Sequence, residues 1–454
     1  MRTSKEKTGM DMLHGKLFGK LLLFALPLAA SSILQQLFNA VDVAVVGQFA
    51  SSQEQAAVGC NGPVINLLIN LFVGVSVGTN VAIANYIGQE HKERIHAAVH
   101  TSMVAAIVSG VLLLGAGMLA ARSLLVWMDT PAEVLGYAVT YLRIYFWGMP
   151  FIMVYNFGAA ILRSMGDTKR PLYCLVVSGV INAGLNMFLV IVFHLGAAGV
   201  AIATVISNVV SAAMVWRFLS DEAEPVRLSA RELRVSVPEL LRILQIGVPA
   251  GIQGMVFSIA NVFVQSALNS LGTNAVAGSA VALNYEYFTY FVVAAFNQAT
   301  VTFTSQNYGA KQYGRCKKIF WLCMAASVLA TGAMSLVFVV GRGFFASFFT
   351  PDPAVAAFAK TRMLHTLSLS FICASYEIGG AALRGVGYSM MPALITIFGT
   401  CVVRIWWIYT VFARVGSFEI LMDVYPLTWF LTGGAVLAAY FILRRRAYSG
   451  KVRL

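Results

Sequence analysis

The sequence predicts an all-α membrane protein of twelve transmembrane helices, in two six-helix lobes related by a pseudo-two-fold axis along the membrane normal. Three observations predict this fold. Hydrophobic residues make up 59% of the 454 residues and charged residues only 11%, whereas soluble domains carry roughly 25% charged residues. The apolar residues form long runs close to the ~20 residues that span hydrocarbon. The second half of the chain repeats the first at a spacing of about 221 residues.

The repeat is carried by a matched motif. Leu162–Gly166 followed by Pro171 returns as Leu383–Gly387 followed by Pro392, with Arg, Gly and Pro at the same offsets. A duplicated half in an apolar chain is typical of a two-lobed transporter, and six spans per half make the repeat parallel. The expected domains are an N-lobe at 1–216, a cytoplasmic linker loop at 217–242 and a C-lobe at 243–454.

The apolar runs are continuous rather than alternating, which favours helices over strands. Charged loops separate them, and a polar stretch broken by Pro225 and Pro238 divides the two halves. The twelve spans are expected at 18–46, 57–84, 97–121, 134–162, 171–193, 198–216, 243–268, 275–303, 319–340, 358–382, 391–412 and 425–443.

The net charge of +13 is unevenly distributed. Lys and Arg gather before the first span, in the linker loop and after the last span, while the opposite side holds few, Arg362 among them. Because positive residues mark the cytoplasmic side, we expect both termini inside a multi-pass cell-membrane protein that contacts lipid and no nucleic acid. The six cysteines are scattered without metal-ligand spacing, so we expect small buried hydrophobes and no certain metal site.

The first span carries a polar face. Gln35, Asn39 and Asp42 are spaced i, i+4 and i+7, with Gln36 beside them, and Pro27 can bend the helix. A charge at bilayer depth costs at least ~2.5–3.5 kcal/mol, so such a group usually faces a bundle interior or a wet cavity. Asp42 is therefore a candidate functional residue.

The fifth and sixth spans place further polar groups at a similar depth. Asn182 and Asn186 are one helical turn apart, and Thr204 follows a run of small residues. At ~1.5 Å per residue, all three fall between the middle and the outer half of the membrane, as does Asp42. This common depth permits a carboxylate, two amides and a hydroxyl to surround one small cation or a proton.

In the second half, two acids and one base lie inside spans: Glu286, Glu377 and Arg404. A buried Arg needs a carboxylate partner, and depth favours the Glu286–Arg404 pair. The aromatic residues around Glu286, such as Tyr285, can either stack on an organic cation or pack against lipid and core.

These residues resemble those of the multidrug and toxic compound extrusion (MATE) transporters over nearly the whole chain. The matching features are the Pro27…Gln36…Asp42 helix, the 162–168 motif with its second-half copy, and the small-residue run ending at Thr204. The resemblance implies two six-helix lobes and export of organic, often cationic, compounds against entering protons or sodium.

The resemblance also implies a coupling site in the N-lobe, formed by Asp42, Asn182, Asn186 and Thr204. Asn186 stands where many members have Asp, which favours a proton over sodium because a site with less charge binds a cation more weakly. We expect alternating access in a monomer, with no cofactor besides the coupling ion, proton or Na+. The candidate substrate-cavity residues are Gln36, Asn39, Tyr285, Glu286, Glu377 and Arg404.

Two other functional classes fit the sequence less well. A lipid-linked precursor flippase of related architecture needs a strongly basic central cavity, for which only Arg404 and Arg143 are candidates. An intramembrane enzyme is not expected, because the sequence contains neither H-E-x-x-H nor G-x-S-x-G.

Overall fold

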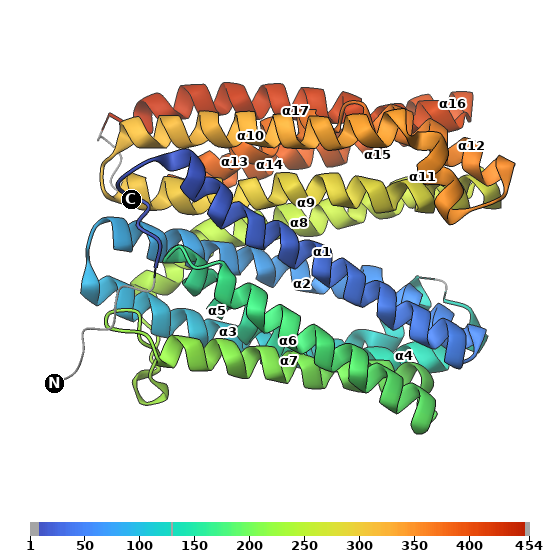
Figure 1. The fold of residues 1–454 in the computed structure, drawn as a ribbon, viewed down its shortest axis with the longest axis horizontal. Helices are drawn as coiled ribbons and strands as arrows, with labels where there is room; N and C mark the ends of the chain where they lie inside the picture. Colours follow the sequence, from blue (N-terminus) through green and yellow to red (C-terminus); the bar gives the residue numbers. More distant parts are fainter. Residues whose placement is uncertain (1–8, 129, 450–454) are drawn as a thin grey trace. The chain divides into compact units, whose positions relative to one another are not determined.

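The computed structural model describes residues 9–128 and 130–449, apart from the side chains at 63 and 64. The basic residues at the two extreme ends of the chain, on which part of the predicted orientation depends, lie outside these ranges. The described residues are helical and contain no strand, which confirms the predicted all-α class (Figure 1).

The first repeat consists of α1 (Leu17–Phe49), α2 (Ser52–Gly88), α3 (Lys92–Trp127), α4 (Ala132–Trp147), α5 (Met149–Ser164), α6 (Lys169–Met187), the π-helix η1 (Phe188–Val192) and α7 (Gly196–Ser220). The connection between the repeats contains the short helix η2 (Ala230–Glu232).

The second repeat consists of α8 (Val237–Asn269), α9 (Thr273–Gly309), α10 (Tyr313–Val340), α11 (Arg342–Phe349), α12 (Pro353–Arg362), η3 (Met363–Leu367), η4 (Ser370–Ile372), α13 (Cys373–Gly385), α14 (Met390–Thr396), η5 (Ile397–Val402), α15 (Val403–Trp407), η6 (Ile408–Phe412), α16 (Ala413–Val415) and α17 (Phe418–Ala447).

Each of the twelve predicted spans overlaps one of these helices or a consecutive run of them. Among the described residues, ten helices are long and apolar enough to cross a membrane, and the pair α4–α5, bent by 48°, makes an eleventh. The one remaining predicted span, at 275–303, corresponds to α9, whose 37 residues give about 55 Å of helix with a more polar sequence. The break between α4 and α5 precedes Pro150, which lacks a backbone donor and whose ring clashes with the preceding turn.

The duplication seen in the sequence extends to the backbone. Helices α2 and α9 both have 37 residues, and α1 and α8 both have 33. Gly166 and Gly387, which close the repeated motif, both have φ of 91°. This left-handed conformation favours glycine, and a Cβ at Gly166 would also press against Met10 and Met12.

The chain divides into two compact units. Residues 30–251 and the described residues before Gly15 form the first unit; residues 15–29 and 252–449 belong to the second. Helices α1 and α8 therefore each contribute to both units, and each division point lies two residues beyond a proline, Pro27 or Pro249. Compared with the predicted lobes, the start of α1 groups with the second unit, and the linker and the start of α8 group with the first.

Small residues allow close helix packing inside the first unit. Gly74 and Gly78 on α2 approach Gly247 and Gly251 on α8 so closely that a Cβ on any of them would overlap the backbone of the other helix. Contacts between small residues are a usual way for helices to associate in lipid, where no hydrophobic driving force joins them.

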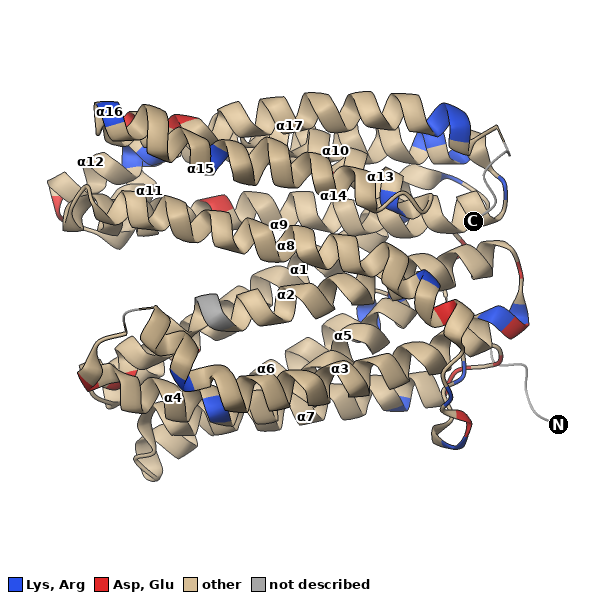
Figure 2. Cartoon of the chain, turned by 180° about the vertical axis from the view of Figure 1, so that it is seen from behind, with Lys and Arg blue, Asp and Glu red and all other residues tan. Residues whose placement is uncertain are grey.

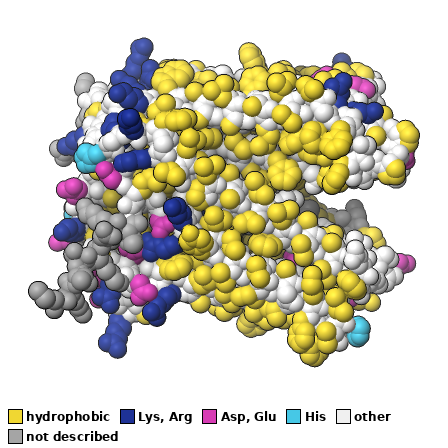
Figure 3. Space-filling model, viewed as in Figure 1, with side chains coloured by type: hydrophobic (Ala, Val, Ile, Leu, Met, Phe, Trp, Pro, Cys, Tyr) yellow, Lys and Arg dark blue, Asp and Glu magenta, His cyan; other side chains and the backbone are white. Residues whose placement is uncertain are grey.

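The outward surface is apolar. Leu119 is 86% exposed and Phe348 is 76% exposed, as expected of side chains that face acyl chains. Figure 3 shows hydrophobic side chains along the length of the helices, with Lys and Arg gathered mainly towards the helix ends. In Figure 2 charged residues are likewise concentrated towards the helix ends, and few interrupt the middle of the helices. The six cysteines are free thiols, and all except Cys60 are buried, as predicted.

Candidate functional site

The first unit contains a chain of polar side chains that ends on a carboxylate. Asn186 on α6 donates a hydrogen bond to Asp42 Oδ1 on α1, and its amide nitrogen also lies 3.2 Å from Asn182 Oδ1. Asn182 in turn donates to Thr204 Oγ1 on α7 over 3.3 Å. Three helices thus bring together the four residues that the sequence placed at one depth.

The site has an unused acceptor. Asn186 is fully buried, and its Oδ1 has no hydrogen-bond partner among the described residues. Asp42 is only partly buried. A buried amide oxygen without a donor is costly, so this oxygen next to a carboxylate fits either a proton donor or a small cation. Tyr141 and Tyr145 on α4 are close enough to Asp42 to interact with it electrostatically, a contribution that sequence reasoning missed.

Local structure positions these groups. Asn182 and Asn186 lie one turn apart on α6, which continues directly into the π-helix η1; π-helical turns occur frequently at functional sites. Beyond it, Glu54 accepts a hydrogen bond from the backbone N–H of Ala197 over 3.3 Å at the start of α7. An acidic side chain is favourable at a helix N-terminus, and Glu54 therefore anchors the helix that presents Thr204.

Two other predicted residues of α1 do not join this chain. Asn39 is exposed and Gln36 is partly buried, and within the described residues neither bonds to the Asp42 group. They lie on the same helix as Asp42, but Asp42 is the residue that reaches α6.

In the second unit, the predicted Glu286–Arg404 pair is wrong. Glu286 on α9 is held by Arg362 on α12, with Nε–Oε1 at 2.8 Å and Nη2–Oε2 at 3.0 Å, and by the hydroxyl of Thr366 at 2.7 Å. The sequence counted Arg362 among the basic residues of the outer side, near the start of the span at 358–382, whereas the structure buries this side chain to 2% exposure on α12, which starts at Pro353. The expected depth in the membrane could not show which of the two arginines, Arg362 or Arg404, pairs with Glu286.

Arg404 is buried without a carboxylate partner among the described residues. Its Nη1 lies 3.2 Å from Asn261 Oδ1, and its Nε lies 3.4 Å from Thr428 Oγ1. The guanidinium also stacks 4.6 Å from the ring centroid of Tyr425, to which Arg362 lies at 5.4 Å. Cation–π contacts and neutral hydrogen bonds therefore stabilise a charge that was expected to need an acid.

The remaining predicted residues of the second unit have separate environments. Glu377 accepts hydrogen bonds from Asn297 and, over 3.3 Å, from the hydroxyl of Tyr290. Tyr285 is buried among phenylalanine rings, and its hydroxyl donates to the backbone oxygen of Phe345 over 2.9 Å. Tyr285 is therefore a packing residue, and the exposed Tyr290 is the aromatic residue that lies beside an acid.

Comparison with known proteins gives a consistent result. The MatE family model matches residues 27–188 and again 249–410. The chain is 28% identical over 383 residues to the probable multidrug resistance protein YoeA of Bacillus subtilis, covering 83% of each protein. It is 24% identical to the probable multidrug resistance protein NorM of Thermotoga maritima, covering 85% of this chain and 84% of that protein.

Solved structures show the same fold. A crystal structure of MATE in the bent conformation matches with a TM-score of 0.88 at 22% identity, covering 99% of each chain. A MOP superfamily transporter from Pyrococcus furiosus, whose binding pocket is described as reversed in polarity, matches with a TM-score of 0.89 at 23% identity, covering 99% of this chain and all of that one.

Proposed function

The chain belongs to the MatE family of multidrug efflux transporters, and on this premise we propose that it exports organic, often cationic, compounds in exchange for entering protons. The observation that carries the proposal is the hydrogen-bonded chain from Asp42 through Asn186 and Asn182 to Thr204. It provides one ionisable group connected to polar side chains on two other membrane-spanning helices.

The proposed cycle alternates between outward-open and inward-open states. In the outward state Asp42 takes up a proton, which removes the charge that Asn186 stabilises and changes the hydration of α1. Pro27, inside α1, interrupts the backbone hydrogen bonds of the helix and allows it to bend. Release of the exported compound then favours the inward state, in which Asp42 loses its proton and new cargo binds.

A proton fits this site better than sodium. Asp42 supplies the only carboxylate of the four residues, and the other oxygen donors are two amides and one hydroxyl. A proton requires a single carboxylate, whereas a metal cation is bound more weakly as the number of charged ligands falls. A flippase for lipid-linked anions is not favoured, because the similar proteins YoeA and NorM are named as probable multidrug resistance proteins.

Ethidium efflux from proteoliposomes tests this proposal. An imposed pH gradient should drive efflux by the natural protein. The efflux rate of the Asp42→Asn variant should be at least tenfold lower. Glu133→Gln, which removes an exposed acid on α4, serves as the matched control and should transport normally. Undiminished efflux by the Asp42→Asn variant under the pH gradient would refute the role of Asp42. Efflux driven only by a sodium gradient would show that the coupling ion is sodium and not the proton.

A further inference from the structure

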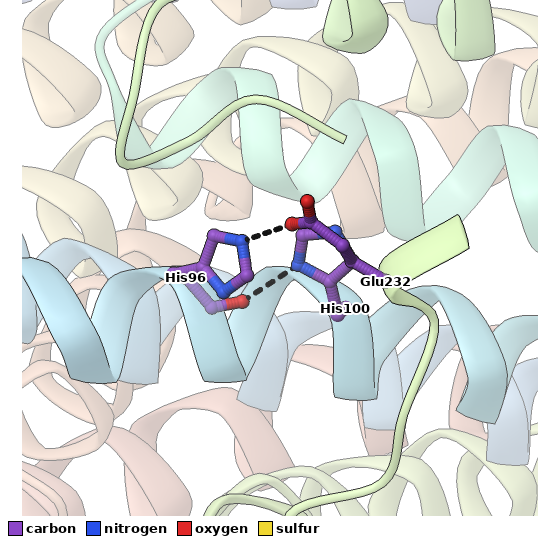
Figure 4. A group of neighbouring side chains, drawn as sticks. All are labelled: His96, His100 and Glu232. Carbon is purple, nitrogen blue, oxygen red and sulfur yellow. Dashed lines mark hydrogen bonds and ion pairs between the residues drawn. The ribbon is translucent and has the colours of Figure 1, made fainter. Parts of the chain in front are cut away.

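Three side chains with metal-binding atoms meet where the connection between the repeats lies against α3. His96 and His100 are one turn apart on α3, and Glu232 comes from η2 (Figure 4). One donor atom from each residue lies within 4.8 Å of the other two. We propose that His96, His100 and Glu232 form a binding site for a zinc ion.

The geometry of the two histidines supports metal binding. His96 Nε2 lies 2.8 Å from Glu232 Oε2, and the two imidazole rings have centroids 4.2 Å apart. His100 Nδ1 lies 2.9 Å from the backbone oxygen of His96. A hydrogen bond at this nitrogen places the proton on Nδ1 and leaves the Nε2 lone pair free to accept, as is usual for metal-bound histidine.

His100 Nε2 already faces the connection. It accepts a hydrogen bond from the backbone N–H of Ser229 over 3.2 Å. A metal would take the place of this donor. An open pocket lies beside the other two residues of the cluster, His96 and Glu232. That pocket has a volume of about 310 Å³ and is lined by His96, Arg231, Glu232, Leu233 and Arg234.

The distances require only a small adjustment. Around a tetrahedral zinc ion with bonds of about 2.0 Å, ligand atoms lie about 3.3 Å apart, so no separation within the 4.8 Å limit has to close by more than about 1.5 Å. The side chain of Glu232 is 54% exposed, so it is free to move as the three ligands adjust around a metal. Two imidazoles and a carboxylate suit zinc rather than calcium or magnesium, and water from the pocket would be the fourth ligand.

Charge limits the affinity. Arg231 and Arg234 line the same pocket, and their positive charges oppose a divalent cation. We therefore expect a dissociation constant in the micromolar range. The residues between the histidines are Ala97, Ala98 and Val99, so no general base accompanies the metal as it does in hydrolytic H-E-x-x-H sites, and the site is regulatory or structural.

A bound metal would restrain the connection. Ser236 already donates its N–H to Thr101 Oγ1 over 3.0 Å, and Glu239 at the start of α8 pairs with Arg94 over 3.4 Å. A metal at Glu232 would add a link four residues before Ser236. Since α8 contributes to both units, occupancy of this site would stiffen the entry to a helix that the two units share.

The test is zinc binding by the full chain in detergent micelles, measured by competition with a chromogenic chelator, which requires no transport. The natural protein should bind one zinc ion per chain, and zinc should slow proteolysis within 221–236. His96→Asn and Glu232→Gln should each weaken binding at least tenfold. They are preferred to a change at His100, because His100 is fully buried and its loss can unfold the protein.

His91→Asn is the matched control, because His91 is an exposed histidine just before α3. It should bind zinc as tightly as the natural protein. Cobalt gives a second measurement: a tetrahedral absorption spectrum is expected in the natural protein and should be absent in the His96→Asn/Glu232→Gln double variant. Equal zinc binding by the natural protein and the double variant, or no stoichiometric binding by the natural protein, would overturn the proposal.

Discussion

The Glu286–Arg362 ion pair provides a quantitative prediction. Both charges lie inside the second unit, where the side chains of Arg362 and Glu286 are 2% and 18% exposed. Glu286→Ala would leave a buried guanidinium without its counter-charge, and breaking such a pair costs about 3–5 kcal/mol. The loss is aggravated by Arg404, because the two guanidinium groups lie 5.4 and 4.6 Å from the centroid of the same ring, that of Tyr425.

Unfolding by SDS in mixed micelles measures this loss as a free energy. The double variant Glu286→Leu/Arg362→Met should recover most of it, because a buried pair can often be exchanged for apolar residues without loss. Asp221→Ala, which breaks the exposed Arg217–Asp221 pair at the C-terminal end of α7, should cost only about 0–1 kcal/mol. A loss below about 1 kcal/mol for Glu286→Ala would show that the buried pair contributes no more than a surface pair.

Three further outcomes are expected. Gly166→Ala should destabilise the protein by about 1–2 kcal/mol, because φ of 91° strains any other residue; Gly434→Ala, which meets no neighbouring atom, should change thermal stability little, and equal effects would contradict this reading. Gly251→Ala should cost about 1–3 kcal/mol by forcing α8 away from the carbonyl of Leu71, and an unchanged melting temperature would contradict the close packing. Asn182→Ala should slow proton-driven efflux, because it breaks the hydrogen bond to the α7 hydroxyl group and removes the acceptor of the Asn186 amide; normal efflux would remove that residue from the coupling chain.

Much of the fold followed from the sequence because the bilayer imposes a simple rule. A helix must be apolar for about 20 residues to cross it, so every predicted span overlaps a helix in the structure. The breaks within spans were less predictable. The bend between α4 and α5 is indicated in the sequence by a proline, Pro150. The π-helical turns η3, η5 and η6 have no comparable sequence pattern.

The sequence predicted some of the candidate site residues correctly and missed others. Asp42 was recognisable because an acid inside an apolar run is expensive, and its partners shared its depth. The pairing of Arg362 with Glu286 was missed because Arg362 lies near the end of its span, where an arginine at the membrane surface and a buried arginine have the same sequence context. The histidine cluster was missed, although His96 and His100 have the i, i+4 spacing of two ligands on one helix face.

The sequence by itself determined the membrane class, the duplicated plan and the residues whose burial must be compensated, because hydrophobic length and residue spacing are properties of the chain alone. The tertiary structure decided which partners compensate them. Asp42 meets Asn186, Glu286 meets Arg362 rather than Arg404, and Glu232 meets His96. Partner choice depends on the rotation and crossing of packed helices, where a turn of one residue moves a side chain by about 100°, and depth along the membrane carries no information about that angle.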